Sequence, residues 1–203
     1  MQMKTIRLAV LASVLVSAGA YAAEPFVGPT VGLSVSSVRS TVDFGGSLNI
    51  PSMSTTRTTS DLNVGYGFAV APKVVVNTGM SINLDQPSLG SSSYLGGTET
   101  VSGKMKDRWS LSVAPGYLVT PKLMAYGKVA YQYANIEVND SFVGSVTKHF
   151  HGWGYGVGVA YQPMAHVETS LEWLKTEYST QHDGMSTGRP MTSAVTLGVN
   201  YRF

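Results

Sequence analysis

The chain lacks cysteine, has few charged residues and contains no long apolar stretch beyond its N-terminal region. Without cysteine there are no disulfides and no thiolate metal ligands. Charged residues make up only 13% of the 203 residues. Beyond the N-terminal region no run of about 18 apolar residues occurs, which argues against a transmembrane helix. Phosphate-binding and dinucleotide-binding glycine motifs are also missing. The stability of the fold must therefore come from hydrogen bonds and packing.

The N-terminal region has the three-part layout of a secretory signal peptide. Lys4 and Arg7 precede the apolar run 8–16, and small residues ending in Ala20-Tyr21-Ala22 follow it. This order predicts a signal peptide over residues 1–22, cleaved after Ala22. The apolar run is shorter than the roughly 20 residues of a membrane-spanning helix, although a retained anchor is the alternative reading.

The remainder, residues 23–203, is expected to form one domain with almost no net charge. Every acidic residue lies in this part, which keeps twelve basic and twelve acidic side chains. The slightly basic precursor therefore gives no reason to expect a nucleic-acid partner.

The C-terminal segment shows the clearest strand pattern. Five apolar residues alternate with polar residues or glycine: Val195, Leu197, Val199, Tyr201 and Phe203. A strict period of two predicts a β-strand with one apolar and one polar face.

Seven other segments show the same alternation. They are 27–42, 61–70, 74–84, 108–117, 123–133, 153–162 and 166–173. In the first, the apolar phase changes after Val35, which predicts a bulge near Ser36-Ser37. Gly127 interrupts the pattern of 123–133. The sequence thus predicts eight strands.

The segments between the predicted strands alternate in length. Three short turns are centred on Ala71-Pro72-Lys73, Thr120-Pro121-Lys122 and Gln162-Pro163-Met164. Four longer polar connections cover about 43–59, 85–103, 139–147 and 178–192. Short turns at one end and long loops at the other are typical of an outer-membrane β-barrel, with both termini at the short-turn, periplasmic end.

Aromatic residues are expected at both ends of the apolar faces. Near the short turns these are Phe26, Phe68, Tyr117, Tyr161 and Phe203, and toward the long loops Trp109, Tyr133, Trp153 and Trp173. Two such bands match the aromatic girdles of membrane barrels. A soluble β-sandwich also has alternating strands, but it buries its apolar face and needs no such bands. The predicted fold class is all-β: an eight-stranded antiparallel transmembrane β-barrel with up-and-down meander topology.

Charged residues occupy the opposite, inward faces of the predicted strands. We expect a lumen charge network of Asp61, Arg108, Lys128, Glu168 and Glu172, with Gln132 and His166 also inward. Because eight strands leave an interior that side chains fill, these charges should pair and plug the barrel. The alternative is a gated ion path, favoured only by the space that Gly152, Gly154, Gly156 and Gly158 leave.

Catalytic and metal sites are not expected. His166, Glu168 and Ser170 share one strand face and combine a base, an acid and a nucleophile type, but a spacing of two does not ensure contact. They also lie near the short turns, away from the lipid that a lipid A-modifying enzyme would act on. His149 and His151 provide too few ligands for a metal and are read as interface residues. The chain is therefore interpreted as a non-enzyme without cofactor.

Three stretches resemble a known family. They are the glycine-alternating 152–161, the turn Gln162-Pro163 followed by 167–173, and the terminal Tyr201-Arg202-Phe203. They resemble the Gram-negative outer-membrane protein β-barrel domain, the OmpA/OmpX and opacity-type group. The resemblance implies residence in the cell outer membrane, contact with its lipid and lipopolysaccharide, and a monomer. It also implies that Tyr201 and Phe203 belong to a signal read by the barrel-assembly machinery.

Function is then expected to be that of an envelope structural and surface-interaction scaffold. Four exposed loops would meet an extracellular ligand, since loops on a rigid scaffold are where recognition usually resides. A small low-conductance channel is the alternative, and a lipid A-modifying enzyme is a further one.

Overall fold

A computed structural model describes residues 25–46, 53–85, 88–94, 99–140, 144–179, 181–183 and 186–203. The predicted signal peptide and its cleavage after Ala22 lie outside these residues. Within the described part, no helix is long and apolar enough to cross a membrane.

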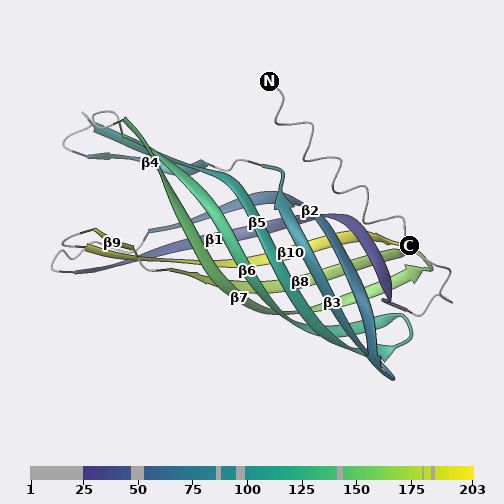
Figure 1. Cartoon of the computed structure of the whole chain (residues 1–203). Coiled ribbons are helices and arrows are strands. Elements are labelled where there is room, and N and C mark those ends of the chain that lie inside the picture. Colours follow the sequence, from purple (N-terminus) through teal and green to yellow (C-terminus); the bar gives the residue numbers. More distant parts are fainter. Residues whose placement is uncertain are drawn as a thin grey trace.

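Eight long antiparallel strands form a closed barrel (Figure 1). They are β1 (Gly28–Gly46), β2 (Met53–Ala71), β3 (Val74–Asn83), β5 (Glu99–Thr120), β6 (Leu123–Asp140), β7 (Gly144–Met164), β8 (Val167–Tyr178) and β10 (Ser186–Arg202). Each pairs with the next in the chain, and β1 pairs with β10 from Thr30–Arg202 to Gly46–Ser186. The predicted eight-stranded antiparallel meander is confirmed, and closure leaves the barrel wall without a free edge.

The strand register sets the width of the barrel. Starting from Leu33, the pairing path reaches β7 at His151 in one direction and at Tyr161 in the other. One full circuit of the barrel therefore shifts the register by ten residues along β7, which is the shear number of the barrel. Eight strands with such a stagger are strongly tilted and enclose an interior that side chains largely fill.

Side-chain burial follows the alternation in the sequence. Large apolar residues lie on the outer surface; for example, Leu197 is 64% and Val157 61% exposed. Polar residues such as Ser36, Asp61 and Glu172 are buried on the inner face. This arrangement is the inverse of a soluble protein and is the one that a lipid environment favours.

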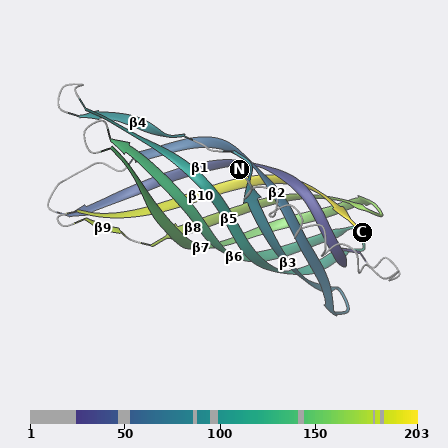
Figure 2. The same ribbon diagram turned by 45° about the horizontal axis from the view of Figure 1, so that its top comes forward.

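The strands continue far into the segments predicted as long loops. Two additional strands, β4 (Ser88–Tyr94) and β9 (Gln181–Asp183), pair with β5 and β10 in these extensions. Figures 1 and 2 show β4 and β9 at one end of the barrel and the C-terminus at the other. The prediction of loops over 43–59, 85–103, 139–147 and 178–192 was therefore wrong for most of their length. Serine and threonine can pair in a β-ribbon without an apolar face, which period-2 apolar counting does not detect.

Two of the three short turns lie where they were predicted. The turns fall at Pro72-Lys73 and Pro121-Lys122, whereas the third lies at Ala165-His166 and not at Gln162-Pro163-Met164. Strand β7 continues through Pro163 to Met164 with a register shift between Tyr161 and Met164. A bulge tolerates proline because the extra residue there makes no ladder hydrogen bond.

The predicted bulge at Ser36-Ser37 is absent. The register of β1 with both neighbours is continuous through this region. Val38 instead points into the barrel and is 7% exposed. The apolar phase changes because β1 has an apolar residue on its inner face here, and Val38 lines a mainly polar cavity together with the apolar Leu174 and Ala194. Pairing of β5 with β6 does shift between Lys106 and Trp109, around Asp107.

Phe26 does not belong to the outer aromatic band. It is fully buried and packs with Val75, Met124 and Ala160 in an apolar cluster at the short-turn end. The expectation of an outward Phe26 was wrong because its segment precedes β1 and does not follow the strand's alternation. Phe68, Tyr117, Tyr161 and Phe203 are outward and exposed as predicted.

Candidate functional site

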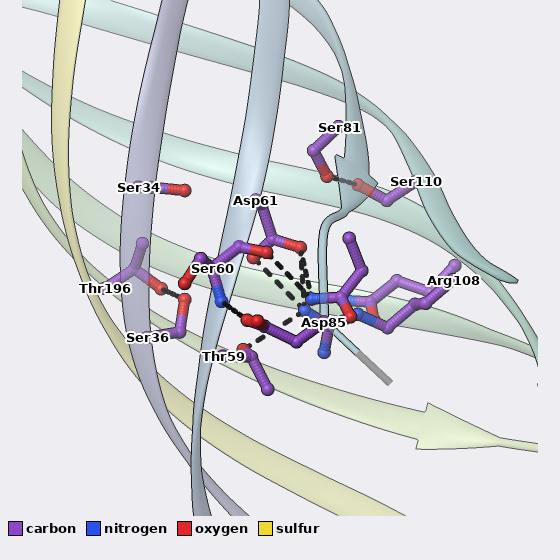
Figure 3. A network of polar contacts seen from close by, with 12 residues as sticks. Ser34, Ser36, Thr59, Ser60, Asp61, Ser81, Asp85, Arg108, Ser110 and Thr196 are labelled. Atoms are coloured by element: carbon purple, nitrogen blue, oxygen red, sulfur yellow. Dashed lines mark hydrogen bonds and ion pairs between the residues drawn. The ribbon is translucent and has the colours of Figure 1, made fainter. Parts of the chain in front are cut away.

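Inside the barrel, the first ion pair joins β2 to β5 at the height where β3 ends. Arg108 Nη2 donates to both carboxylate oxygens of Asp61, at 2.9 and 3.1 Å. Asn83 Nδ2 also donates to Asp61 at 3.0 Å. Figure 3 shows Asp61 and Arg108 beside the Ser36–Thr196 hydrogen bond. Asp61 is 7% exposed, so the pair holds two largely desolvated charges together.

The second ion pair joins β6 to β8. Lys128 Nζ lies 2.9 Å from Glu172 Oε1, and the other carboxylate oxygen accepts a hydrogen bond from Tyr126 at 3.1 Å. Tyr126 and Lys128 are inward because they alternate with the outward residues of β6. The Glu172 carboxylate on β8 therefore has two partners on the inner face of β6, across the intervening strand β7.

The third ion pair includes a residue that was not predicted as part of the network. Arg202 Nη2 lies 2.5 Å from Glu168 Oε2, and Asn200 Nδ2 donates to the other oxygen at 3.1 Å. Arg202 Nη1 also donates to the carbonyl oxygen of Gly28 at 3.0 Å. Arg202 stands on the polar face of the last predicted strand, so the same alternation identifies it as inward.

The described lumen thus contains three cations matched by three anions. All five predicted members, Asp61, Arg108, Lys128, Glu168 and Glu172, take part in these pairs, with Arg202 as the sixth. Above them a layer of uncharged side chains is also hydrogen-bonded: Gln132 donates to Thr176 at 2.9 Å and accepts from Tyr178 at 3.1 Å. These ion pairs and hydrogen bonds connect different strands of the barrel through its interior.

Two cavities remain between these layers. The larger, of about 150 Å³, is lined mainly by serine, threonine, asparagine and the lower charge pairs. The smaller, of about 70 Å³, lies next to the Asp61–Arg108 pair. They share several lining residues, namely Ser34, Asn63, Ser81, Ser110, Lys128, Glu172 and Thr196. The described lumen therefore keeps small polar cavities between side chains that fill most of it.

The glycines of β7 do not leave a free path. A Cβ at Gly158 would lie 2.5 Å from the ring of Tyr126, and one at Gly156 would lie 3.0 Å from the side chain of Leu174. Inward side chains from β6 and β8 thus occupy the space over β7. The expectation that these glycines leave open space along one wall was wrong, because the side chains of Tyr126 and Leu174 pack over them.

His166, Glu168 and Ser170 are not assembled into a catalytic group. His166 lies exposed in the turn before β8, where its ring stacks on Tyr201 at 5.5 Å and Nδ1 contacts the Arg202 carbonyl oxygen at 2.8 Å. Its predicted inward position was wrong, since the shifted turn removes it from the strand. Glu168 is engaged by Arg202, and Ser170 lines the larger cavity.

His149 and His151 lie on the outer surface among aromatic rings. His149 Nδ1 contacts Tyr133 Oη at 2.9 Å and Asn135 Oδ1 at 2.6 Å, and the His151 ring stacks on Tyr131 at 6.5 Å. Among the residues that the structure describes, no three histidine or carboxylate side chains are grouped so as to hold a metal ion.

A closed antiparallel barrel with an apolar exterior and a paired polar interior is the architecture of an outer-membrane β-barrel protein. The sequence matches the family described as the outer membrane protein beta-barrel domain over residues 8–203, and the chain belongs to that family. A comparison with curated proteins found no match.

Solved structures with the same fold include those of two bacterial proteins. One is Ail, the attachment invasion locus protein of Yersinia pestis, solved with the heparin analogue sucrose octasulfate. It is 14% identical, with a TM-score of 0.53 over 87% of this chain and 100% of that one. The other is Neisserial surface protein A, 13% identical, with a TM-score of 0.50 over 84% and 97%. At these identities the likeness concerns the fold.

Proposed function

We propose that the protein is a surface-interaction scaffold of the outer membrane whose β-hairpin extensions reach beyond the bilayer. The observation that carries this proposal is strand length. A membrane-spanning β-strand needs about 9–11 residues, whereas β5 has 22 and β7 has 21.

The excess length lies at one end of the barrel. From Trp153, in the aromatic band, β7 continues to its first residue, Gly144. Nine residues at about 3.3 Å each extend about 30 Å along the strand. At the other end the strands are joined by tight turns. In the proposed orientation the hairpins face the cell exterior and both termini face the periplasm.

The interior supports a scaffold better than an enzyme. The charged side chains of the lumen that the structure describes, from Asp61 to Arg202, form three ion pairs with one another. Of the three residues with catalytic potential, His166 and Glu168 are each hydrogen-bonded to Arg202, and Ser170 lines the larger cavity. We propose that the protein is a non-enzymatic monomer, and that Tyr201 and Phe203, exposed on the outer face of β10, act as the C-terminal assembly signal.

The ligand is proposed to meet the hairpins and not the barrel wall. The Ail structure with a heparin analogue provides a precedent for a ligand on a barrel of this fold. Among the described residues β4 pairs with β5 alone, so deleting residues 88–103 removes β4 and the first five residues of β5 and leaves the rest of the eight barrel strands in place. Asp85, which accepts a hydrogen bond from the backbone of Ser60, is retained.

The test compares the intact protein and this deletion variant in phospholipid vesicles on an array of heparin, other glycans and matrix proteins. We expect the intact protein to bind at least one component and the deletion to weaken that binding at least tenfold. Lys73→Ala and Lys122→Ala, in the turns at the opposite end, serve as controls and should bind normally. Folding is checked by heat-modifiable gel mobility. Binding that survives in the folded deletion variant, or no binding to any component, would contradict the proposal.

A further inference from the structure

The segment before β1 crosses the short-turn end of the barrel from one side to the other. Phe26 precedes β1, yet its ring packs against Val75 of β3, Met124 of β6 and Ala160 of β7. In the strand order, β6 lies four positions from β1 and so on the opposite side of the wall. The ring therefore occupies the centre of the lumen at this end.

Several contacts hold the segment in this position. At the first two residues of β1, which follow the segment directly, the Arg202 guanidinium donates to the Gly28 carbonyl oxygen at 3.0 Å, and the Phe203 N–H donates to the Pro29 carbonyl oxygen at 3.0 Å. A Cβ at Gly67 would lie 2.0 Å from the carbonyl oxygen of Phe26, so the close approach to β2 requires glycine there. The segment that contains Phe26 therefore packs closely against the barrel wall.

The backbone of Phe26 is strained in this arrangement. Its φ is 64°, in the left-handed region that bulky side chains rarely adopt. Such a conformation persists only when surrounding contacts outweigh its cost, and strained residues gather at functional positions. Burial of the whole ring is the compensating contact.

A polar chamber begins directly above the ring. Met124 and Ala160 belong both to the apolar cluster and to the wall of the cavity of about 150 Å³. Asn63, Asn77 and Asn200 line the same cavity. Arg202, 4% exposed, also lines it, and its Nε is buried without a protein partner. A chamber with this lining and volume suits several water molecules.

The chamber extends toward the hairpin end through the second cavity, which shares Asn63, Lys128 and Glu172 with the first. Ions pass through hydrated polar passages but are stopped by apolar constrictions that exclude water. Along the described lumen the cluster around Phe26 is formed by apolar side chains, whereas the layers above it combine charges and amides with single apolar residues such as Val38 and Leu174. The main barrier to an ion therefore lies at Phe26.

We propose that the lumen is an ion pathway held closed at its short-turn end by the side chain of Phe26. This activity is separate from the proposed scaffold role, which depends on the hairpins at the other end. The predicted cleavage after Ala22 would leave three residues before Phe26, so the plug would lie close to a free chain end.

The main test is single-channel recording of the purified protein in planar bilayers. Phe26→Gly removes the ring and also relieves the positive φ, so the variant is expected to fold. We expect its mean conductance to exceed that of the unchanged protein at least tenfold. Phe26→Leu retains apolar bulk and should remain closed, and Phe68→Ala, an exposed aromatic on the outer face, should have no effect.

A second measurement uses the absence of native cysteine. Ser112, in the wall of the larger cavity, is replaced by cysteine, and its reaction with a charged methanethiosulfonate is timed in detergent micelles. We expect Phe26→Gly to accelerate the reaction at least tenfold and Phe26→Leu to leave it slow. Unchanged conductance and an unchanged reaction rate in folded Phe26→Gly would overturn the proposal.

Discussion

Arg202 connects four strands from inside the barrel. It stands on β10 and contacts Glu168 of β8, Asn77 of β3 and the Gly28 carbonyl of β1. Both members of its ion pair are almost fully buried, with side chains 4% and 8% exposed. A buried pair adds little net stability compared with apolar residues, but removing one partner leaves a costly unpaired charge.

Replacing Arg202 by methionine should therefore destabilise the barrel strongly. Glu168 would keep only Asn200 as a side-chain donor, and the expected loss is about 3–5 kcal/mol in the free energy of unfolding. The measurement is urea unfolding in vesicles followed by tryptophan fluorescence. The double variant Arg202→Met with Glu168→Gln should lose less, because no charge is left unpaired.

Arg39→Met, at an exposed position on the outer face of β1, is the control and should change stability by less than about 0.5 kcal/mol. Unfolding of Arg202→Met at the urea concentration of the unchanged protein would show that Glu168 is neutralised or solvated without its partner.

Strand β1 illustrates what decides the orientation of side chains within an element. Its outward residues are Leu33 and Val35 and then Ser37 and Arg39, so the outer face changes from apolar to polar along one regular strand. Strand β5, by contrast, is irregular at Asp107, where φ is 45° and the register with β6 shifts. In β6, Gly127 lies opposite Pro115, between the pairs Val113–Val129 and Gly116–Tyr126 of the β5–β6 ladder, and proline has no N–H to donate there.

Because the outer face of β1 changes from apolar to polar, a charge introduced there should lower the free energy of unfolding by an amount that depends on its position along the strand. Leu33→Arg, at the centre of the apolar part, should destabilise the barrel by about 2–4 kcal/mol, and Ser37→Arg by only about 0–1 kcal/mol. The same urea unfolding in vesicles measures both. Equal costs at the two positions would mean that the edge of the lipid-facing band does not fall between them.

The whole molecule is asymmetric along its axis, with tight turns at one end and paired hairpins at the other (Figure 2). The same asymmetry separates the two proposals, since the hairpins belong to the proposed exterior surface and Phe26 to the opposite mouth. Orientation in the membrane is therefore the property on which the proposed function depends most.

Orientation can be tested with single cysteines, because the chain has none of its own. Thr147→Cys, exposed on β7 near the hairpin end, should react with a membrane-impermeant maleimide on intact cells. Lys73→Cys, in a short turn, should react only after the outer membrane is permeabilised. The reverse pattern would refute the proposed orientation.

Period-2 alternation in the sequence by itself determined the class of fold, the number of barrel strands and the side of the wall on which Asp61, Lys128 and Glu172 lie. These properties are local, because successive side chains of a strand point to opposite faces. Only the tertiary structure decided that Val38 and Phe26 point inward, that Arg202 completes the charge pairs and that the loops are largely β-ribbon. Those outcomes depend on which residues meet across the lumen or between hairpins, and such contacts leave no periodic signal in the chain.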